Sequence, residues 1–379
     1  MQAVCVSCFN YYDNRIKYIE SFFTKKGYEV IYITSNFDHI RKVKYAINRS
    51  NVIQIPTLPY YKNLSFQRLL SHYLFSKRVI DRINEIRPDL LYIIIPPNSL
   101  VKFVSRYVKK SHTTLIYDLY DLWPETFPST KAKKLLAIPF KFWGKLRDKN
   151  IGAADVVFTE CKLYQDRLKE QLSGIKTCTL YLTKEDTTIE NSIDVTIDTD
   201  SVNICYLGSI NNIIDISRIH KLLHAINKLK PVTLHIIGDG ESREQFINTI
   251  RSSNINVNFE GKIFDEAKKK AIFDKCSFGL NIMKDTVCVG LTMKSIDYFQ
   301  AGLPILNNIK ADTEKIVENY EIGFNVNDEN IDEIAKKVAN FDKQKLSEMK
   351  IRTKRVFDEL FSIAAFNNKL ETVLKEVIE

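Results

Sequence analysis

Short hydrophobic runs alternate with amphipathic stretches along the first half of the chain. Six runs rich in β-branched residues are strand candidates: Gln2–Cys8, Glu29–Thr34, Val52–Ile55, Leu90–Ile95, Thr114–Asp118 and Val156–Thr159. Between them, apolar residues recur at helical spacing in Asn14–Lys26, Ser65–Ile86 and Asn98–Lys110. Continuous apolar strands that alternate with helices are typical of a parallel sheet covered on both faces.

The second half repeats this alternation. Its strand candidates are Val202–Leu207, Val232–Ile237, Val257–Glu260, Phe278–Ile282 and Pro304–Leu306, and its helix candidates are Ile216–Leu229, Ser242–Ser252, Asp265–Asp274 and Met293–Ala301. We therefore predict an α/β protein with two Rossmann-like, doubly wound domains at 1–182 and 202–356. The polar segment 183–201 would be the linker, and a helix at roughly 357–379 could pack back on the first domain. Ligands of such sheets bind outside the carboxyl ends of the strands, so we expect the site where the two domains face each other across a cleft.

Composition narrows the class of protein. The 379 residues are 45% hydrophobic and 27% charged, which is ordinary for a soluble globular protein. No apolar run approaches the ~20 residues of a spanning helix, and no secretory signal is evident, so we expect a cytoplasmic protein. Cys5 and Cys8 form a C-x-x-C inside an apolar run, and we interpret them as core residues rather than a redox or metal site. The net charge of +9 suits nucleic acid, anionic lipid or phosphorylated substrates, depending on where it lies.

The most informative segment spans 285–305. A Gly290-Leu291-Thr292 loop leads into a helix near Met293, and the free N–H groups at a helix start suit a diphosphate. Lys294 lies in the first turn, where a cation is unfavourable without an anion. Asp297 is one turn further on, so the alternative is an ordinary helix with a solvent-side ion pair.

This segment has the pattern K-x-x-[DE]-Y-x-x-A-G-x-P and resembles the donor-site helix of retaining GT-B glycosyltransferases of family 4. The resemblance implies that Lys294 contacts the donor pyrophosphate and that Asp297 binds the ribose hydroxyls. Gly290, Leu291 and Thr292 would offer backbone N–H groups to the phosphates or the sugar. Many relatives carry a second Glu eight residues before the ribose acid, where this chain has Val289.

Glycines follow other strands of the second half, where tight turns let a ligand approach the backbone. The segment at 259–263 resembles the strand end whose backbone meets the nucleotide base. Further donor-site candidates are Gly208, Ser209, Gly238, Gly261, Lys262 and Ile263.

In the first half, the segment at 117–125 follows a predicted strand. It resembles the D-x-x-D-x-W-P-E segment of family 4 enzymes that build bacterial surface polysaccharides. The resemblance assigns Asp118 and Asp121, with Lys294, to catalysis, and Trp123 and Glu125 to the acceptor side. The alternative is a surface turn with Trp123 packed in the core.

Two further stretches bear on the acceptor. Asp13 and Arg15 follow the first strand and are candidate acceptor contacts, although Asp13 could equally be a helix N-cap. Residues 131–149 combine basic and large apolar side chains, which is typical of an amphipathic segment that docks on an anionic membrane surface. The helix 67–82 could widen that patch. The alternative is two amphipathic helices with solvated lysines.

The resemblance implies retaining transfer of a sugar from a nucleotide diphosphate sugar, with a UDP-sugar favoured. The acceptor would be a glycan, polyprenyl-diphosphate-linked as in relatives, in capsule, O-antigen or exopolysaccharide synthesis at the inner face of the cell membrane. No metal, other cofactor or nucleic acid is expected; Arg218 could be a second cation for the diphosphate. A non-catalytic GT-B partner subunit, which Val289 favours, and a GT-B epimerase or phosphorylase remain alternatives.

Overall fold

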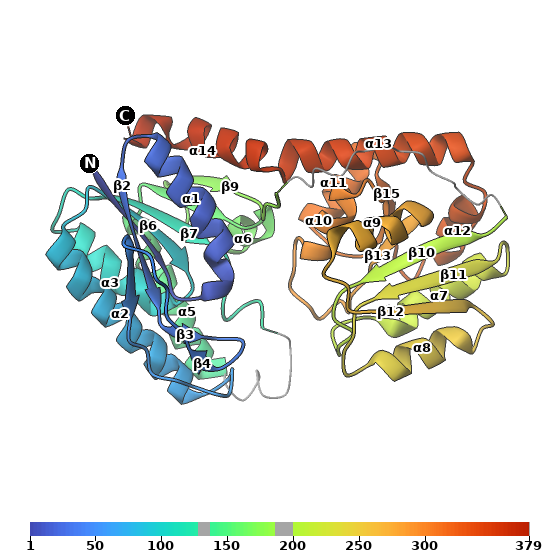
Figure 1. The fold of residues 1–379 in the computed structure, drawn as a ribbon, viewed down its shortest axis with the longest axis horizontal. Helices are drawn as coiled ribbons and strands as arrows, with labels where there is room; N and C mark the ends of the chain where they lie inside the picture. The colour runs from blue at the N-terminus through green and yellow to red at the C-terminus, as the bar shows by residue number, and fades with distance from the viewer. Residues whose placement is uncertain (128–136, 186–199, 379) are drawn as a thin grey trace. The chain divides into compact units, whose positions relative to one another are not determined.

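The computed structural model describes residues 1–127, 137–185 and 200–378. The chain divides into two compact units (Figure 1). Unit 1 comprises Met1–Leu182 together with Phe366–Glu379, and unit 2 comprises Thr183–Ala365. Each unit has a parallel sheet covered by helices, so the predicted class of two doubly wound α/β domains is confirmed. Residues 131–136 of the amphipathic segment and 186–199 of the expected linker lie outside the described residues.

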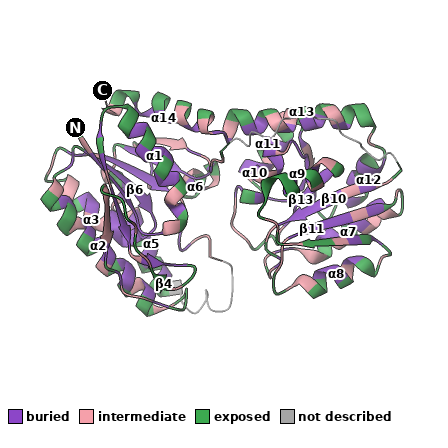
Figure 2. Cartoon of the chain, viewed as in Figure 1, coloured by how far each residue is buried: buried purple, intermediate pink, exposed green. Residues whose placement is uncertain are grey.

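Unit 1 contains a seven-stranded parallel sheet in the order β5-β2-β1-β6-β7-β8-β9. Leu90–Ile95, an unbroken apolar run, forms a strand that is buried along its whole length (Figure 2). The strands are β1 (Gln2–Ser7), β2 (Glu29–Ser35), β5 (Val52–Ile55), β6 (Leu90–Ile95), β7 (Thr114–Leu119), β8 (Val156–Thr159) and β9 (Lys176–Thr179), and β3 (Phe37–Asp38) and β4 (Val43–Lys44) form a short antiparallel ribbon.

The direction of each crossover between strands determines which face of the unit 1 sheet a helix covers. The crossover from β1 to β2 runs towards one edge of the sheet, and those from β6 to β8 run towards the other. Right-handed crossovers therefore place α1 on the face opposite α3 and α5. The helices are α1 (Asp13–Lys25), α2 (Phe66–Ile86), α3 (Asn98–Val108), α5 (Ala137–Asp148), α6 (Lys162–Arg167) and α14 (Ile363–Ile378), with short 3₁₀ turns η1 (Asn10–Tyr12) and η2 (Ile151–Ala153).

The helix α14 completes unit 1 on the side of α1. The Phe366 ring packs against Tyr18, with 5.9 Å between ring centroids, and lies 4.9 Å from the guanidinium of Arg15. Ion pairs join Lys26 to Glu371 and Lys176 to Glu376. Residues 366–378 are thus part of the core of unit 1 rather than an appendage.

Unit 2 contains a six-stranded parallel sheet in the order β12-β11-β10-β13-β14-β15. Its strands are β10 (Val202–Leu207), β11 (Val232–Ile237), β12 (Asn256–Gly261), β13 (Phe278–Asn281), β14 (Ile305–Asn307) and β15 (Gly323–Asn325). Its helices are α7 (Ile216–Asn227), α8 (Arg243–Arg251), α9 (Glu266–Lys275), α10 (Met293–Gln300), α11 (Asp312–Tyr320), α12 (Ile331–Ala339) and α13 (Lys343–Leu360). None of the described helices is long and apolar enough to cross a lipid bilayer.

Candidate active site

Three glycine turns form a backbone shelf at the carboxyl edge of the unit 2 sheet. Gly208, Gly238 and Gly261 end the neighbouring strands β10, β11 and β12. The amide of Gly208 donates to the Ile237 carbonyl at 2.9 Å, and that of Gly238 donates to the Gly261 carbonyl at 2.8 Å. A Cβ at Gly238 would lie 1.9 Å from the Gly208 carbonyl oxygen, so only glycine fits there. No atom lies within 4 Å of a Cβ placed at Gly208 or Gly261, so the backbone at these two turns has open space beside it for a ligand.

The loop between β13 and α10 presents unused backbone donors beside this shelf. The Gly290 carbonyl accepts from the Thr313 amide at 2.9 Å and from its hydroxyl at 2.7 Å. Thr292 caps α10, and its hydroxyl donates to the buried Asn281 amide oxygen at 2.9 Å. Among the described residues, no hydrogen bond uses the N–H groups of Gly290, Leu291 or Thr292. These hydrogen bonds fix the loop through a carbonyl and a side chain, so its backbone N–H groups stay available to an anion.

Lys294 is a buried cation in the first turn of α10. Its side chain is 8% exposed, and its ammonium lies 4.9 Å from the ring centroid of Tyr206 on β10. No carboxylate within the described ranges forms an ion pair with it, and burial lowers its pKa to about 8. Both the burial and the positive end of the helix dipole disfavour this charge. An anion bound at this position would relieve both.

Asp297 does not form the ion pair with Lys294 that an ordinary helix was expected to have. Its partners are other lysines. Its carboxylate pairs with Lys184, and the Lys269 ammonium lies 3.9 Å away. Lys184 is fixed in turn, because its amide donates to the Phe361 carbonyl at 3.2 Å. The structure does not contain the ion pair between Lys294 and Asp297, so the ammonium of Lys294 is available to another anion.

Tyr298 explains why the motif carries an aromatic residue after the acid. Its hydroxyl accepts from the Leu207 amide at 2.7 Å, which anchors α10 to the end of β10. Its ring fills the space above Gly279, where a Cβ would approach within 2.8 Å of it. Tyr298 therefore fixes the helix that positions Lys294.

The remaining donor-site candidates lie along the same edge of the sheet. Ser209 and Lys262 are exposed, Ile263 is half-buried, and Leu291 is buried. Val289, where many relatives have a glutamate, is half-buried. Sequence reasoning missed Phe264, which directly follows Ile263 and is 86% exposed. The sequence did contain a signal for it, a single aromatic residue soon after the end of a predicted strand.

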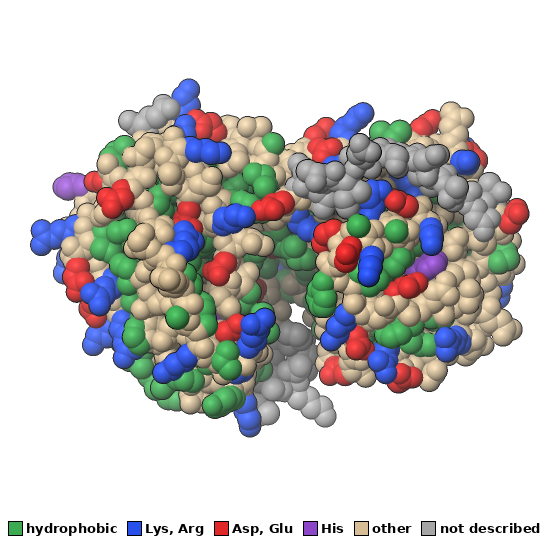
Figure 3. All heavy atoms as spheres, viewed as in Figure 1, with side chains coloured by type: hydrophobic (Ala, Val, Ile, Leu, Met, Phe, Trp, Pro, Cys, Tyr) green, Lys and Arg blue, Asp and Glu red, His purple; other side chains and the backbone are tan. Residues whose placement is uncertain are grey.

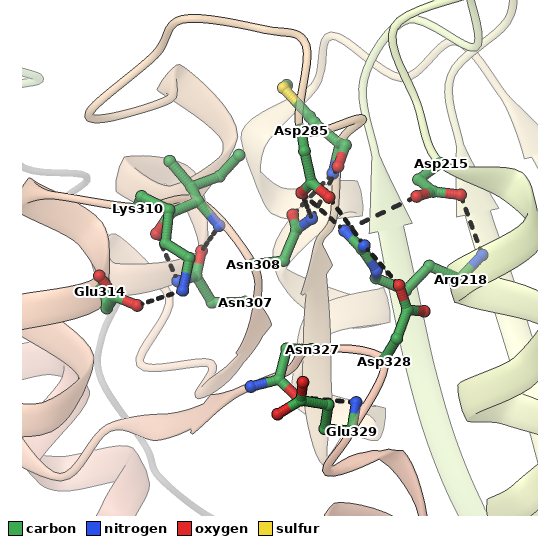
Figure 4. A network of polar contacts seen from close by, with 12 residues as sticks. Asp215, Arg218, Asp285, Asn307, Asn308, Lys310, Glu314, Asn327, Asp328 and Glu329 are labelled. Atoms are coloured by element: carbon green, nitrogen blue, oxygen red, sulfur yellow. Dashed lines mark hydrogen bonds and ion pairs between the residues drawn. The ribbon is translucent and has the colours of Figure 1, made fainter.

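Arg218 does not fit the expected role of a second cation (Figure 4). Its guanidinium makes a two-pronged contact with Asp285, at 2.8 and 2.9 Å, and contacts Asp328 at 3.0 Å. Asp215, which caps α7, lies 3.7 Å away. This cluster lowers the pKa of Asp285 and ties the start of the 285–292 loop to α7. Arg218 is thus balanced by carboxylates and supports the loop.

In unit 1, Asp118 and Arg15 form a buried ion pair. They are not the open site groups that the sequence led us to expect. Asp118 is fully buried and accepts from Arg15 at 2.8 and 3.2 Å and from the Tyr92 hydroxyl at 2.6 Å. The other guanidinium N–H groups of Arg15 donate to the carbonyls of Leu180 and Tyr181, at 2.7 and 2.8 Å. The pair joins α1, β6, β7 and the chain after β9.

Asp121 is the more accessible of the two predicted catalytic carboxylates. It is half-buried and accepts from the Thr126 hydroxyl at 2.9 Å. Desolvation raises its pKa to about 6. Tyr11, which is 41% exposed, lies close enough to interact electrostatically with Asp121.

The other acceptor-side candidates are held by neighbours. Trp123 is 6% exposed and packs among aromatic rings, in agreement with the core alternative. Glu125 forms a two-pronged ion pair with buried Arg147, at 2.7 and 3.2 Å. Asp13 is the first residue of α1 rather than its N-cap, and accepts from the Tyr32 hydroxyl at 2.9 Å.

Comparison with known proteins agrees with this geometry. The family described as glycosyl transferases group 1 matches residues 201–342, which include the whole Lys294 motif. A comparison with curated protein sequences gave no match.

Solved structures match both units. HepE from Anabaena, in complex with UDP and glucose, superposes with a TM-score of 0.62 at 14% identity over 100% of each chain. Sucrose-phosphate synthase from Thermosynechococcus elongatus gives 0.69 at 12% identity, over 100% of this chain and 99% of that one. WaaG, a glycosyltransferase involved in lipopolysaccharide biosynthesis, gives 0.62 at 11% identity over 98% and 99%. Residues 201–342 therefore match the family of group 1 glycosyl transferases, and the chain as a whole has the GT-B fold of the solved structures that it matches.

Proposed function

We propose that the protein transfers a sugar from a UDP-sugar to a glycan acceptor with retention of the anomeric configuration. The observation that carries this proposal is Lys294, a buried ammonium without a carboxylate partner among the described residues, beside the unused N–H groups of Gly290–Thr292. Solved structures of HepE, with 14% and 15% identity to this chain, contain UDP and UDP-glucose, which favours uridine as the donor base.

The reaction would break the bond between the anomeric carbon and the β-phosphate oxygen. Both electrons of that bond leave with UDP, so negative charge develops on the diphosphate. We assign the stabilisation of this charge to Lys294 and the loop amides. The acceptor hydroxyl would attack from the face that the diphosphate leaves and would pass its proton to a leaving phosphate oxygen. This route needs no protein nucleophile, and we expect it to need no metal ion.

We assign the rest of the donor to neighbouring groups. Asp297, oriented by Lys184, would accept hydrogen bonds from the ribose hydroxyls. The backbone at Lys262–Ile263 would meet the base, and the exposed Phe264 ring could cover it.

On the acceptor side, Asp121 is our candidate for the residue that orients the attacking hydroxyl. Asp118 and Arg15 would support the strand end that presents it, because both are enclosed and bound to each other. The acceptor we propose is a lipid-linked glycan of a bacterial surface polysaccharide, and α5, within the basic and apolar segment 131–149, would lie near the membrane surface.

The test is thermal stabilisation by nucleotides in the absence of added metal. We expect UDP to raise the melting temperature more than GDP, CMP or NAD, since selective binding stabilises the folded state. Lys294→Ala should abolish the shift, and UDP-glucose should be turned over only by the wild type. No shift with any nucleotide would contradict the donor site and favour a non-catalytic partner subunit.

A further inference from the structure

A mostly apolar pocket of about 250 Å³ lies in unit 1, between the start of α2 and the start of α5. Its lining includes Leu64, Phe66, Leu69, Phe140, Trp143 and a single charged residue, Arg68. Water occupies about 30 Å³ per molecule in the liquid, so the pocket has room for roughly eight heavy atoms. That is close to the size of a short hydrocarbon chain.

Large apolar side chains of the pocket remain in contact with solvent. Phe66 and Leu64, which line it, are 80% and 43% exposed. Ile138 and Phe142, which are neighbours in sequence of the lining residues on α5, are 71% and 66% exposed. Exposed apolar clusters of this kind mark sites that bind apolar groups. Figure 3 shows hydrophobic and basic side chains side by side over the lower part of unit 1.

Arg68 places a positive charge in the wall of this pocket. It is 6% exposed, and its guanidinium stacks 4.2 Å from the ring centroid of Trp123. One terminal nitrogen donates to the Asn63 carbonyl at 3.0 Å, while its Nε is enclosed without an acceptor. No carboxylate in the described part of the chain forms an ion pair with it. The rings of Trp123 and Tyr60 offset part of the cost of burying this charge, and an anion would complete the contacts of the guanidinium.

Asp121 is close enough for the charge of Arg68 to act on its carboxyl group, but the two side chains form no ion pair. The sequence has no Asp or Glu from 39 to 80, or from 126 to 147, and the residues that line the pocket fall within these two ranges. Ser65 and Phe66, at the pocket, begin the 21-residue helix α2, whose positive dipole end adds to the field of Arg68. An apolar chain that ends in a phosphate matches both the lining and the charge.

We propose that this pocket binds the apolar chain of a lipid-linked acceptor beside its phosphate, with Arg68 on the phosphate. The inference rests on the proposed function and names the acceptor class that the enzyme would use. Trp123, on which Arg68 stacks, is two residues from Asp121. A phosphate on Arg68 would therefore hold the first sugar of the acceptor near the carboxylate that we assign to its hydroxyl.

Tryptophan fluorescence tests the site directly. The chain has two tryptophans; Trp143 lines the pocket and Trp123 lies against Arg68. We expect geranyl phosphate to change the emission saturably. Inorganic phosphate and geraniol should each bind at least about tenfold more weakly, because each offers half of the interaction. Geranyl phosphate that binds no more tightly than inorganic phosphate would overturn the proposal.

Paired variants separate the two halves of the ligand. Arg68→Met should weaken geranyl phosphate at least about tenfold and leave geraniol unchanged, while Arg68→Lys should lose less. Phe66→Ser should weaken geranyl phosphate and leave inorganic phosphate unchanged. The matched controls are Arg82→Met, on the same helix, and Ile351→Ser, an exposed residue in unit 2. Unaltered binding by Arg68→Met with its circular dichroism intact would also overturn the proposal.

The result stays distinct from the test of the donor site. UDP stabilisation depends on Lys294 in unit 2, whereas the fluorescence change depends on Arg68 in unit 1. If UDP binds and geranyl phosphate does not, the lipid acceptor inference fails while the proposed transferase function stands. If UDP fails to bind and the geranyl phosphate response is intact, the proposed transferase function fails and the pocket stands only as a binding site for a phosphate with an apolar chain.

Discussion

Replacing Lys294 with methionine should stabilise the protein while it removes donor binding. The methionine keeps much of the apolar stem that packs on Tyr206 and deletes the buried charge. Burial lowers the pKa of Lys294 from 10.5 to about 8, and each pKa unit corresponds to about 1.36 kcal/mol. The charge therefore costs about 3 kcal/mol of folding stability at neutral pH, less whatever the contact with the tyrosine ring returns.

The sign of the pH dependence follows from the lowered pKa. Between pH about 8 and 10.5 the unfolded chain holds a proton on Lys294 that the folded protein lacks. The wild type should therefore gain stability as the pH rises through this window. The advantage of Lys294→Met should be full below pH 8 and should vanish above pH 10.5.

Differential scanning calorimetry at pH 7, with and without UDP, measures both effects. For units of this size, 1 kcal/mol shifts the melting temperature by about 2–4 °C, so we expect a rise of several degrees in the transition of unit 2. UDP should then add no further shift. Lys310→Met is the control, because Lys310 is exposed and paired with Glu314. A destabilised Lys294→Met protein, or one that UDP still stabilises, would refute the reasoning.

Three further predictions concern the two units. UDP affinity by calorimetric titration should be constant from about pH 7, where the terminal phosphate is fully ionised, to pH 8. It should fall up to about tenfold per pH unit above pH 8, because binding needs the protonated Lys294, and a flat profile to pH 9.5 would argue against that contact. Gly238→Ala should destabilise unit 2 by several kcal/mol in thermal melts, since its Cβ would meet a carbonyl oxygen at 1.9 Å. Gly208→Ala, with no atom within 4 Å but a φ of +121°, should cost only about 1–3 kcal/mol. Asp121→Asn should lose transfer activity and keep stabilisation by UDP. Asp118→Asn should cost about 3–5 kcal/mol of stability, because its guanidinium partner, Arg15, is left unpaired. Equal effects of the two variants on transfer activity and on stability would contradict this division.

The fold was predictable because most of its inner strands are buried on both faces. Val52–Ile55, Leu90–Ile95 and Val202–Leu207 were predicted with the bounds that the structure has. Leu90–Ile95 is an unbroken apolar run, and each of the other two has a single polar residue between apolar ends. The short outer strands β9 and β15 were missed. Lys176–Thr179 carries lysine, threonine and cysteine, and Gly323–Asn325 is only three residues long, so neither has a hydrophobic pattern to detect.

The site was predictable only in part, because sequence spacing does not tell which polar groups bind each other. Arg15 and Asp118 are 103 positions apart, and nothing in either segment indicates that they form a closed pair. Arg68 was missed as a site residue, although a signal was present. It stands four residues before His72 and seven before Phe75 on the buried stripe of α2, where a cation is out of place.

The return of α14 to unit 1 has a consequence for the order in which the protein folds as it is made. The 183 residues of unit 2 separate Leu182 from Phe366 in the chain. At about 5–20 residues per second, the ribosome needs on the order of 10–40 s to make them. During that interval unit 1 lacks the helix whose Phe366 covers Arg15, so its apolar α1 face stays open to chaperones or to wrong partners. The N-terminal half of this protein is thus the first to be synthesised and the last to be completed.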